Sequence, residues 1–381
     1  MDLDFTEEQK MLRKMVNDFL TTECPKTKVR ELEEDEKGYS PEMWKEMADL
    51  GWMGLIIPEE YGGMGMTFQD LTIVLEEMGK NILPGPFFCT VVEGSIPILD
   101  AGSQEQKKEF LPKIASGEAI FTLALLEANA KYDASGIAIK GTPKDGSFVI
   151  NGTKLFVEMA HIADYLICAS RTKKETSPEG GITLFIVDAK TPGLHCEVMP
   201  TVGMDKLCEV RFEDVVVPKK NMLGELDKGW PIITRILEKA AIAKCAESIG
   251  GMQASLDMTV AYCKDRVQYE RPIGAFQALQ HMMANMLIAI ETSKCLVYEA
   301  AWMESEGIPC AKEVAMAKAY VNESYKEVTE RAVALHGGIG TSRDHDIPLY
   351  YRRAKTADVA FGGSDFQREA VANKIGLHSK I

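Results

Sequence analysis

Apolar residues recur at helical spacing through the first third of the chain. Thr6 and Gln9 form a capping-box pattern, which predicts the start of an amphipathic helix. Its apolar positions are Met11, Leu12, Met15, Val16, Phe19 and Leu20. The same spacing predicts helices over 41–53, 67–80 and 104–116. The first segment is therefore expected to be all-helical.

Near residue 118 the pattern changes to short apolar runs bounded by turn residues. These runs are AIFTLALLEA, SFVING, ADYLICAS, ITLFIVDA and EVRFEDVVVP. Asn151-Gly152 predicts a two-residue hairpin turn. Because no helices separate the strands and no Gly-x-Gly-x-x-Gly follows one, we expect an antiparallel sheet or small barrel and no doubly wound nucleotide-binding domain.

Helical periodicity returns beyond the strands, over 232–268, 275–306 and 311–335. Helices of this length are typical of a bundle, and the wide apolar arc of the second fits burial against sister helices and another subunit. The chain is thus predicted to be an α+β protein. Its expected parts are an N-terminal helical domain (1–117), a middle antiparallel β-domain (118–225) and a C-terminal four-helix bundle (226–381).

Composition narrows the possible partners. The 381 residues carry a formal net charge of −14, which opposes binding to nucleic acid and to anionic membranes. No apolar run is long enough to span a membrane and the N-terminus is acidic, so a cytoplasmic protein is expected. Arg352, Arg353 and Lys355 could bind a phosphate-bearing ligand or form a solvated face.

Cysteines and histidines do not indicate a metal centre. The nine cysteines include no Cys-x-x-Cys pair, so we expect reduced, mostly buried thiols. The six histidines show no ligand spacing, so no metal site is predicted.

Five motifs, in order along essentially the whole chain, resemble those of the acyl-CoA dehydrogenases. They are IPEEYGGMG (57–65), FVINGTKLFV (148–157), VRFEDVVVPKKNMLGE (210–225), RVQYERPIGAFQALQH (266–281) and LHGGIG (335–340). The resemblance implies an FAD enzyme, usually a homotetramer, that removes two hydrogens from the acyl part of a CoA thioester. A carboxylate takes the proton, flavin N5 accepts the hydride, and electrons pass to electron transfer flavoprotein.

The resemblance also implies cofactor contacts. Phe156 matches an aromatic beside the flavin ring, and Arg266 and Gln277 match residues that reach a neighbouring subunit's FAD. Gly337 and Gly338 match a turn where the backbone approaches the cofactor's phosphates. Without the motifs, an aromatic on a strand would be read as core and an Arg at a helix end as a partner of the helix dipole.

Several positions depart from the family pattern. Leu126, Ala128, Tyr132 and Ala334 replace residues that normally contact the flavin. Glu158 stands where a hydroxyl usually faces the flavin edge, so we expect its carboxylate at the cofactor.

The usual catalytic base is missing. Alignment on Gln367 places Phe361 at the common glutamate position, and the alternative base position falls near Ala240. Glu93, within PFFCTVVEGSIP, is the candidate replacement, because burial among apolar residues would raise its pKa toward neutrality. Glu93 could instead face solvent or pair with a cation.

Glu158 and Glu127 are the weaker candidates for the base. Glu127 matches a glutamate that the family itself carries, so it needs no new role.

The C-terminal segments HGGIG…HDIPLYYRRA…FGGSDFQRE resemble those of one branch of the family. That branch is associated with alicyclic, aromatic-degradation and steroid side-chain substrates. Members of that branch often lack the standard glutamate, and some form mixed assemblies. The leading hypothesis is a dehydrogenase of a cyclic or branched acyl-CoA that uses a relocated carboxylate. One alternative is a non-catalytic subunit that contributes part of a shared FAD site in a mixed tetramer, and another is a reductase or a non-redox CoA-thioester enzyme.

Overall fold

The computed structural model describes residues 5–377, and the chain divides into two compact units. The first comprises Met1–Glu31, Thr67–Leu83 and Ala241–Ile381, and the second comprises Leu32–Met66 and Pro84–Ala240. Each unit therefore combines segments that are distant in sequence. The domain ranges 1–117, 118–225 and 226–381 remain a prediction, because both units draw on the first and the last of them.

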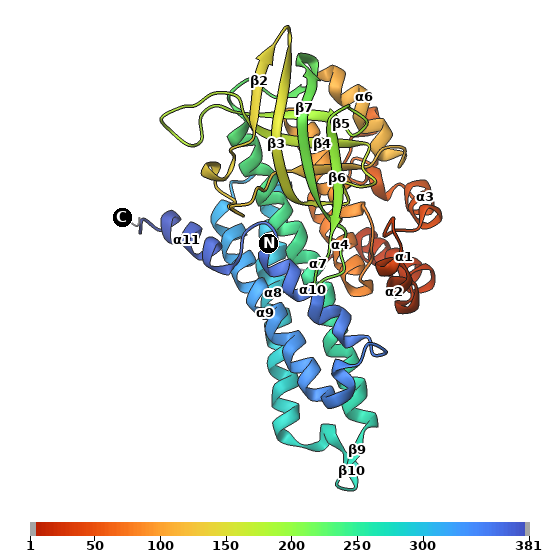
Figure 1. Cartoon of the computed structure of the whole chain (residues 1–381). Coiled ribbons are helices and arrows are strands. Elements are labelled where there is room, and N and C mark those ends of the chain that lie inside the picture. Colours follow the sequence, from red (N-terminus) through yellow and green to blue (C-terminus); the bar gives the residue numbers. More distant parts are fainter. Residues whose placement is uncertain (1–4, 378–381) are drawn as a thin grey trace. The chain divides into compact units, whose positions relative to one another are not determined.

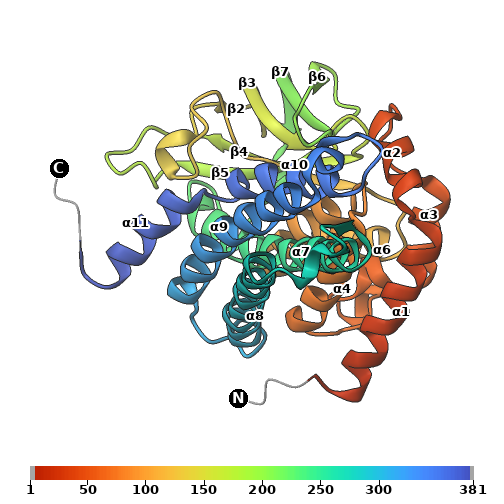
Figure 2. The ribbon, with the colours of Figure 1, turned by 90° about the horizontal axis from the view of Figure 1, so that it is seen from below.

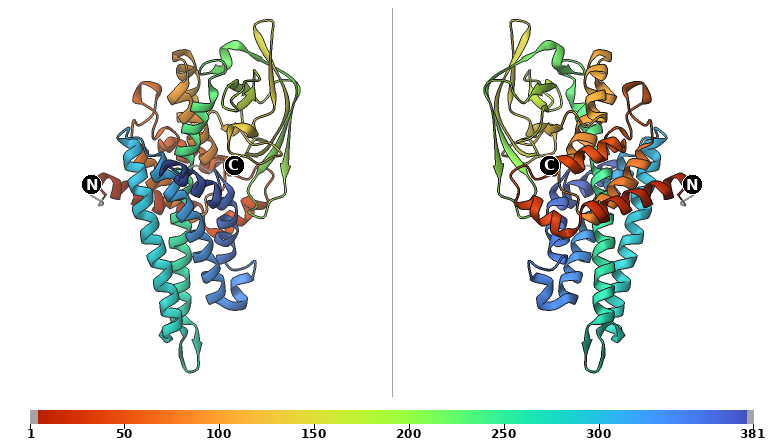
Figure 3. Two further views of the ribbon diagram at one scale, coloured as in Figure 1. Left: turned by 90° about the vertical axis from the view of Figure 1, so that its left-hand side faces the viewer. Right: turned by 90° about the vertical axis from the view of Figure 1, so that its right-hand side faces the viewer.

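The first unit is helical (Figure 1). Its helices are α1 (Glu7–Glu23), α4 (Phe68–Asn81), α8 (Gln277–Ser305), α9 (Ala311–His336), α10 (Ile347–Val359) and α11 (Ser364–Lys374). Two more helices cross the unit boundary, α2 (Lys26–Glu34) and α7 (Gly229–Asp265). A short hairpin of β9 (Val267–Gln268) and β10 (Arg271–Pro272) joins α7 to α8 and lies at the tip of that helix pair (Figure 3).

Local signals explain where these helices begin and how closely they pack. Thr6 and Gln9 form the predicted capping box at the start of α1. Helices α4 and α7 approach so closely that a β-carbon at Gly79 would lie 1.8 Å from the Glu247 carbonyl oxygen. A β-carbon at Gly250 would lie equally close to the Glu76 carbonyl oxygen. The two glycines thus allow backbone contact between the helices. Figure 2 shows α7 and α8 nearly along their axes.

The second unit contains a sheet with short helices. Its helices are α3 (Pro41–Asp49), a π-helix (Cys89–Ser95), α5 (Ile96–Ala101) and α6 (Gln104–Ala115). Its strands are β1 (Phe121–Ala124), β2 (Lys140–Lys144), β3 (Ser147–Glu158), β4 (Tyr165–Arg171), β5 (Ile182–Asp188), β6 (Leu194–Met199), β7 (Leu207–Pro218) and β8 (Met222–Leu223). The order is β6-β7-β3-β2-β4-β5-β8, and β1 pairs with β4.

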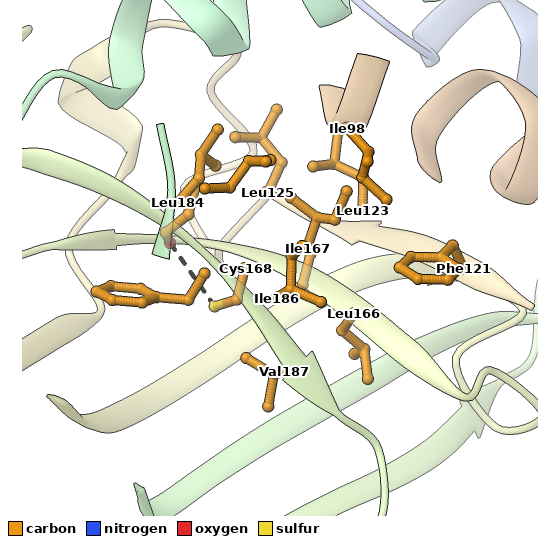
Figure 4. Close-up of a cluster of buried hydrophobic side chains, with 14 of the residues drawn as sticks. Ile98, Phe121, Leu123, Leu125, Leu166, Ile167, Cys168, Leu184, Ile186 and Val187 are labelled. Atoms are coloured by element: carbon orange, nitrogen blue, oxygen red, sulfur yellow. Dashed lines mark hydrogen bonds between the residues drawn. The ribbon is translucent and has the colours of Figure 1, made fainter. Parts of the chain in front are cut away.

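Most of this sheet is antiparallel, but β1 and β2 both pair with β4 in parallel. Apolar side chains of β1, β4 and β5 form a buried core together with Ile98 of α5 (Figure 4). This core explains the continuous apolar runs in the sequence, because strands covered on both faces do not alternate with polar residues.

The predicted hairpin turn at Asn151-Gly152 is wrong. Asn151 lies within β3 and pairs with Lys140, and the register shifts between Ile150 and Gly152. The turn between β2 and β3 lies instead at Asp145-Gly146, where both residues have positive φ angles, 46° and 77°. Asp-Gly suits a two-residue hairpin turn as well as Asn-Gly does. Asn151-Gly152 lies instead at a β-bulge.

The predicted α+β layout is confirmed, with helices at both ends of the chain and strands in the middle. The predicted helices near 41–53, 67–80, 104–116, 232–268, 275–306 and 311–335 all form, within a few residues of the predicted ends. Within residues 5–377, no helix combines the length and apolar character that crossing a membrane requires.

Candidate active site

Glu93 lies at the centre of the π-helix, where all seven residues from Cys89 to Ser95 are buried. Its side chain is only 6% exposed, so the alternative that it faces solvent is wrong. Its Oε2 accepts a hydrogen bond from the backbone N–H of Leu123, at 3.3 Å. Single π-helical turns occur mostly as local insertions at functional sites. The fold thus presents a buried carboxylate on an unusual backbone element.

Glu158 is brought toward the same place. The pKa of the buried Cys89 thiol lies well above its ordinary value, first because of burial and then because of the negative charges of Glu158 and Glu93. Both carboxylates therefore lie near one thiol. Glu158 ends β3, and its backbone carbonyl accepts a hydrogen bond from Thr122 Oγ1 at 2.6 Å.

Phe156 is turned out of the sheet by an irregularity in β3. The pairing of β3 with β7 changes register between Lys154 and Val157, and Phe156 adopts a positive φ of 58°. Its side chain is 43% exposed, so the alternative that it is a core aromatic is wrong. Bulges of this kind redirect a side chain. An exposed aromatic face one residue from Val157 and two from Glu158 suits a flat ligand.

Glu127 is held by a buried network. Its Oε1 accepts from Lys154 Nζ at 2.8 Å and from the backbone N–H groups of Ala138 and Ile139 at 2.9 and 3.1 Å. Lys154 is fully buried and also donates to the Leu125 carbonyl at 2.9 Å. Burial lowers the pKa of Lys154 and opposes the raising effect of the nearby acidic groups. The network anchors the segment between β1 and β2.

The first unit carries the remaining predicted cofactor residues. Gly337 follows α9 with a φ of 64°, and a β-carbon at Gly337 or Gly338 would meet no heavy atom within 4 Å. This turn therefore has open space beside its backbone. Arg266 and Gln277 are both exposed at the ends of α7 and α8, where the Arg266 carbonyl accepts from Ile273 N at 2.8 Å. The structure groups these four positions in one unit, and Glu93, Phe156 and Glu158 in the other.

Phe361 is buried in a tight turn with a φ of 56°. Its carbonyl accepts from Gln367 Nε2 at 2.9 Å. Nearby, Lys318 Nζ donates to the Ala357 carbonyl at 2.7 Å, and Asn322 Nδ2 donates to the Asp358 carbonyl at 3.1 Å. The sequence did not reveal this network, because Lys318 and Asn322 are simply two polar residues at helical spacing. The network holds the turn in which Phe361 stands at the position predicted for the family's usual base.

Comparison with known proteins decides the family. Models of the N-terminal, middle and C-terminal domains of acyl-CoA dehydrogenases match residues 6–118, 122–215 and 227–376. The chain is also 34% identical to "Probable acyl-CoA dehydrogenase YngJ" of Bacillus subtilis (strain 168), over 98% of this chain and 100% of that protein. The chain belongs to the acyl-CoA dehydrogenase family. It is accordingly an oxidoreductase of the class that acts on CH–CH groups, as predicted.

Other acyl-CoA dehydrogenase relatives agree with this assignment. The structure of butyryl-CoA dehydrogenase from Megasphaera elsdenii superposes with a TM-score of 0.92 at 31% identity, covering 98% of this chain and 100% of that chain. "Caffeyl-CoA reductase-Etf complex subunit CarC" of Acetobacterium woodii is 30% identical over 97% of this chain and 99% of that protein. The predicted fold of the acyl-CoA dehydrogenases is therefore confirmed.

Proposed function

We propose that this chain is an FAD-dependent dehydrogenase of a cyclic or branched acyl-CoA, in which Glu93 accepts the substrate proton. The observation that carries the proposal is the burial of Glu93 on the π-helix, next to Cys89 and near Glu158. Phe361, at the position of the usual base, is apolar and cannot accept a proton. A general base must come from another residue, and Glu93 is a buried carboxylate on an element suited to a site.

The chain's residues fit an FAD cofactor. The exposed ring of Phe156 would pack beside the isoalloxazine, and Glu158 would face its edge. The open turn at Gly337 and Gly338 would accept the phosphates, with Arg266 and Gln277 reaching the FAD of a neighbouring subunit. When bound, FAD supplies a two-electron acceptor for the hydride. Leu126 and Ala334 offer no polar side-chain atoms, so backbone groups would supply the contacts that these positions usually make.

The chain's own part in the reaction is to hold the thioester and move one proton. The Leu123 amide fixes one oxygen of Glu93 and so orients the carboxyl group. A fixed carboxylate in a buried site can take the proton as the carbon–hydrogen bond breaks. A base displaced from the usual position would act farther along the acyl group, which suits ring-bearing or branched substrates. One relative is named as a subunit of a caffeyl-CoA reductase complex, and the caffeyl group bears a ring, which supports this substrate class.

The proposal extends to partners. Met282, Leu287 and Ile288 on α8 are 44%, 45% and 61% exposed, which supports burial against other copies in a homotetramer or against a mate in a mixed tetramer. Electron transfer flavoprotein is the proposed electron acceptor, supported by the name of the caffeyl-CoA reductase–Etf relative. We retain the cytoplasm as the proposed compartment.

A visible spectrum of the purified chain, followed by anaerobic titration with CoA thioesters, tests the proposal. We expect a flavin absorbance that is bleached by alicyclic or branched acyl-CoA and less by straight-chain acyl-CoA of matched carbon number. Bleaching by straight-chain substrates alone would contradict the substrate class. A colourless protein that gains flavin only with a co-expressed mate would favour the non-catalytic subunit.

Reduction of an enoyl-CoA is a second candidate, because the caffeyl-CoA relative is named a reductase. The same site would then return a proton from Glu93 to the acyl carbon. Dithionite-reduced enzyme mixed with a panel of enoyl-CoA thioesters separates the two directions. Reoxidation of the flavin much faster than its bleaching by the saturated thioester would favour the reductase.

A further inference from the structure

Two cysteines lie on neighbouring strands at the edge of the sheet. Cys196 on β6 lies opposite Val210, and Cys208 on β7 lies opposite Val198. The two cysteines are therefore diagonal neighbours on the same face, because positions 208 and 210 share a face of β7. Each of the two thiols shifts the pKa of the other, so the two side chains interact.

His161 completes the cluster. Its Nδ1 lies 3.7 Å from Cys208 Sγ, and its Nε2 lies 3.0 Å and 3.2 Å from the carbonyl oxygens of Glu36 and Lys37. Carbonyl oxygens only accept hydrogen bonds, so Nε2 carries a proton. When Nδ1 is also protonated, the ring donates to the sulfur and stabilises a thiolate on Cys208.

The environment distinguishes the two sulfur atoms. The pKa of Cys208 lies below its ordinary value because of its interaction with Cys196, against the raising effect of burial and with help from His161. The pKa of Cys196 is raised, first by its interaction with Cys208 and then by burial. Buried cysteines elsewhere behave differently, since burial raises the pKa of Cys24, Cys168 and Cys245. The surroundings therefore favour loss of the proton from Cys208 over loss from Cys196.

Access and mobility also suit redox chemistry. Cys196 is partly exposed on β6, which ends the described sheet and has one strand neighbour, whereas Cys208 is buried. Diagonal cross-strand neighbours lie about 7–8 Å apart, so β6 must shift for the two sulfur atoms to reach disulfide geometry. Within residues 5–377 no three His, Cys, Asp or Glu side chains are grouped so as to hold a metal ion. Thiol oxidation is thus the chemistry that the cluster supports.

We propose that Cys196 and Cys208 form a reversible disulfide when the protein meets a small disulfide oxidant of the glutathione type. Cys208 first takes the proton of Cys196, and the Cys196 thiolate displaces one glutathione thiolate to form a mixed disulfide. Cys208 then loses its proton and attacks the Cys196 sulfur, which releases the second glutathione. Two protein thiols are oxidised and one glutathione disulfide is reduced to two thiols.

The position links this dithiol to β3. Cys208 lies opposite Val157, the residue between Phe156 and Glu158. A disulfide would tie β6 to the strand that supports these two side chains. The inference itself does not depend on the proposed function, because the disulfide can be observed without turnover.

Mass spectrometry of the full-length protein in graded mixtures of oxidised and reduced glutathione tests the proposal. After acid quenching and blocking of free thiols, we expect a peptide pair cross-linked through Cys196 and Cys208 that grows with the oxidised fraction. A reductant should reverse it fully. Cys196→Ser should abolish the cross-link, whereas Cys295→Ser, which removes an exposed cysteine of α8, should leave it unchanged.

Two further results decide the mechanism. His161→Gln should slow cross-linking several-fold, because the thiolate on Cys208 loses its stabilising partner; an unchanged rate would overturn the role of His161. Wild-type protein that accumulates only a mixed disulfide with glutathione at Cys196, or no cross-link at any ratio, would overturn the dithiol itself. The wild-type result needs no variant that could fail to fold.

Discussion

At the scale of single residues, the buried ion pair with Lys154 gives Glu127 a structural role, whereas Glu93 is the proposed base. Glu127 was a possible base in the sequence, but its Oε1 already accepts from Lys154 and from two backbone N–H groups. Glu93 instead accepts from the Leu123 amide on the π-helix and lies near Glu158. The sequence suggested Glu93 through its apolar neighbours, but it did not show that Lys154 would engage Glu127, 27 residues earlier.

Replacing Lys154 by methionine should destabilise the protein strongly. Glu127 would remain buried without its cation, and breaking a buried pair in this way costs about 3–5 kcal/mol. The matched control is Lys228→Met, which removes a pair with Glu225 whose side chains are both more than 70% exposed, and it should change the unfolding midpoint little. Urea unfolding of the three proteins measures the difference. Equal unfolding midpoints for both variants would contradict the structural role of Lys154.

Lys318 should make stability depend on pH at the alkaline end. Burial lowers its pKa from 10.5 to about 8, so the folded state binds this proton less tightly than the unfolded state. The free energy of unfolding should therefore rise between about pH 8 and 10.5, by roughly 3 kcal/mol from this group.

Comparison with Lys318→Met isolates the contribution of Lys318 to the rise of the free energy of unfolding with pH. The variant lacks the amine, so the contribution of Lys318 to the slope disappears, although the variant is less stable at neutral pH because the turn at 357–362 loses a hydrogen bond. Lys26, whose pKa is also lowered to about 8, titrates in both proteins and cancels in the comparison. Parallel pH profiles of the two proteins would contradict the assignment.

At the scale of elements, glycines serve two different purposes. Gly250 allows α7 to touch the backbone of α4, whereas Gly338 has open space around it. An alanine in a helix is ordinarily more favourable than glycine by about 1 kcal/mol. Whether alanine is tolerated at each position depends on the space around the glycine. The sequence alone does not show that space, so it does not distinguish the roles of these two residues.

Gly250→Ala should destabilise the protein by roughly 1–3 kcal/mol, because the new methyl group would overlap the Glu76 carbonyl oxygen. The measurement is thermal unfolding monitored by circular dichroism. Helix content in the folded state should stay the same. A stabilised variant would show that α4 and α7 are not in contact at this point.

Gly338→Ala should leave the stability of the flavin-free protein within about 0.5 kcal/mol of the wild type. It should nevertheless weaken FAD retention, because the methyl group would occupy the space proposed for the phosphates. Flavin fluorescence released during dialysis measures retention, and unfolding of the flavin-free protein serves as the control. Unchanged retention would remove this turn from the proposed cofactor site.

The elements predicted from the sequence are those with strong local signals. The long helices show clear periodicity, and Thr6 with Gln9 marked the first of them. The π-helix at Cys89–Ser95 has no such pattern, because its widened turn depends on the packing around it. Asn151-Gly152 carried a genuine turn signal, but pairing of β3 with β2 and β7 favoured a bulge there.

At the scale of the whole molecule, the order of helical and strand segments sufficed to predict the fold class. It did not predict that α1 and α4 would join the C-terminal helices in one unit, because such assembly depends on contacts between distant segments. The predicted site residues divide between the two units for the same reason. Periodicity identifies buried faces, but it does not say which faces meet.

The central claim is that Glu93 accepts the substrate proton, and anaerobic stopped-flow spectroscopy tests it most directly. Glu93→Gln keeps an oxygen that can accept from the Leu123 amide but removes the proton acceptor. With an alicyclic acyl-CoA that bleaches the wild-type flavin, we expect bleaching about 10²–10⁴-fold slower, with flavin content unchanged. Bleaching at the wild-type rate in Glu93→Gln would contradict the account.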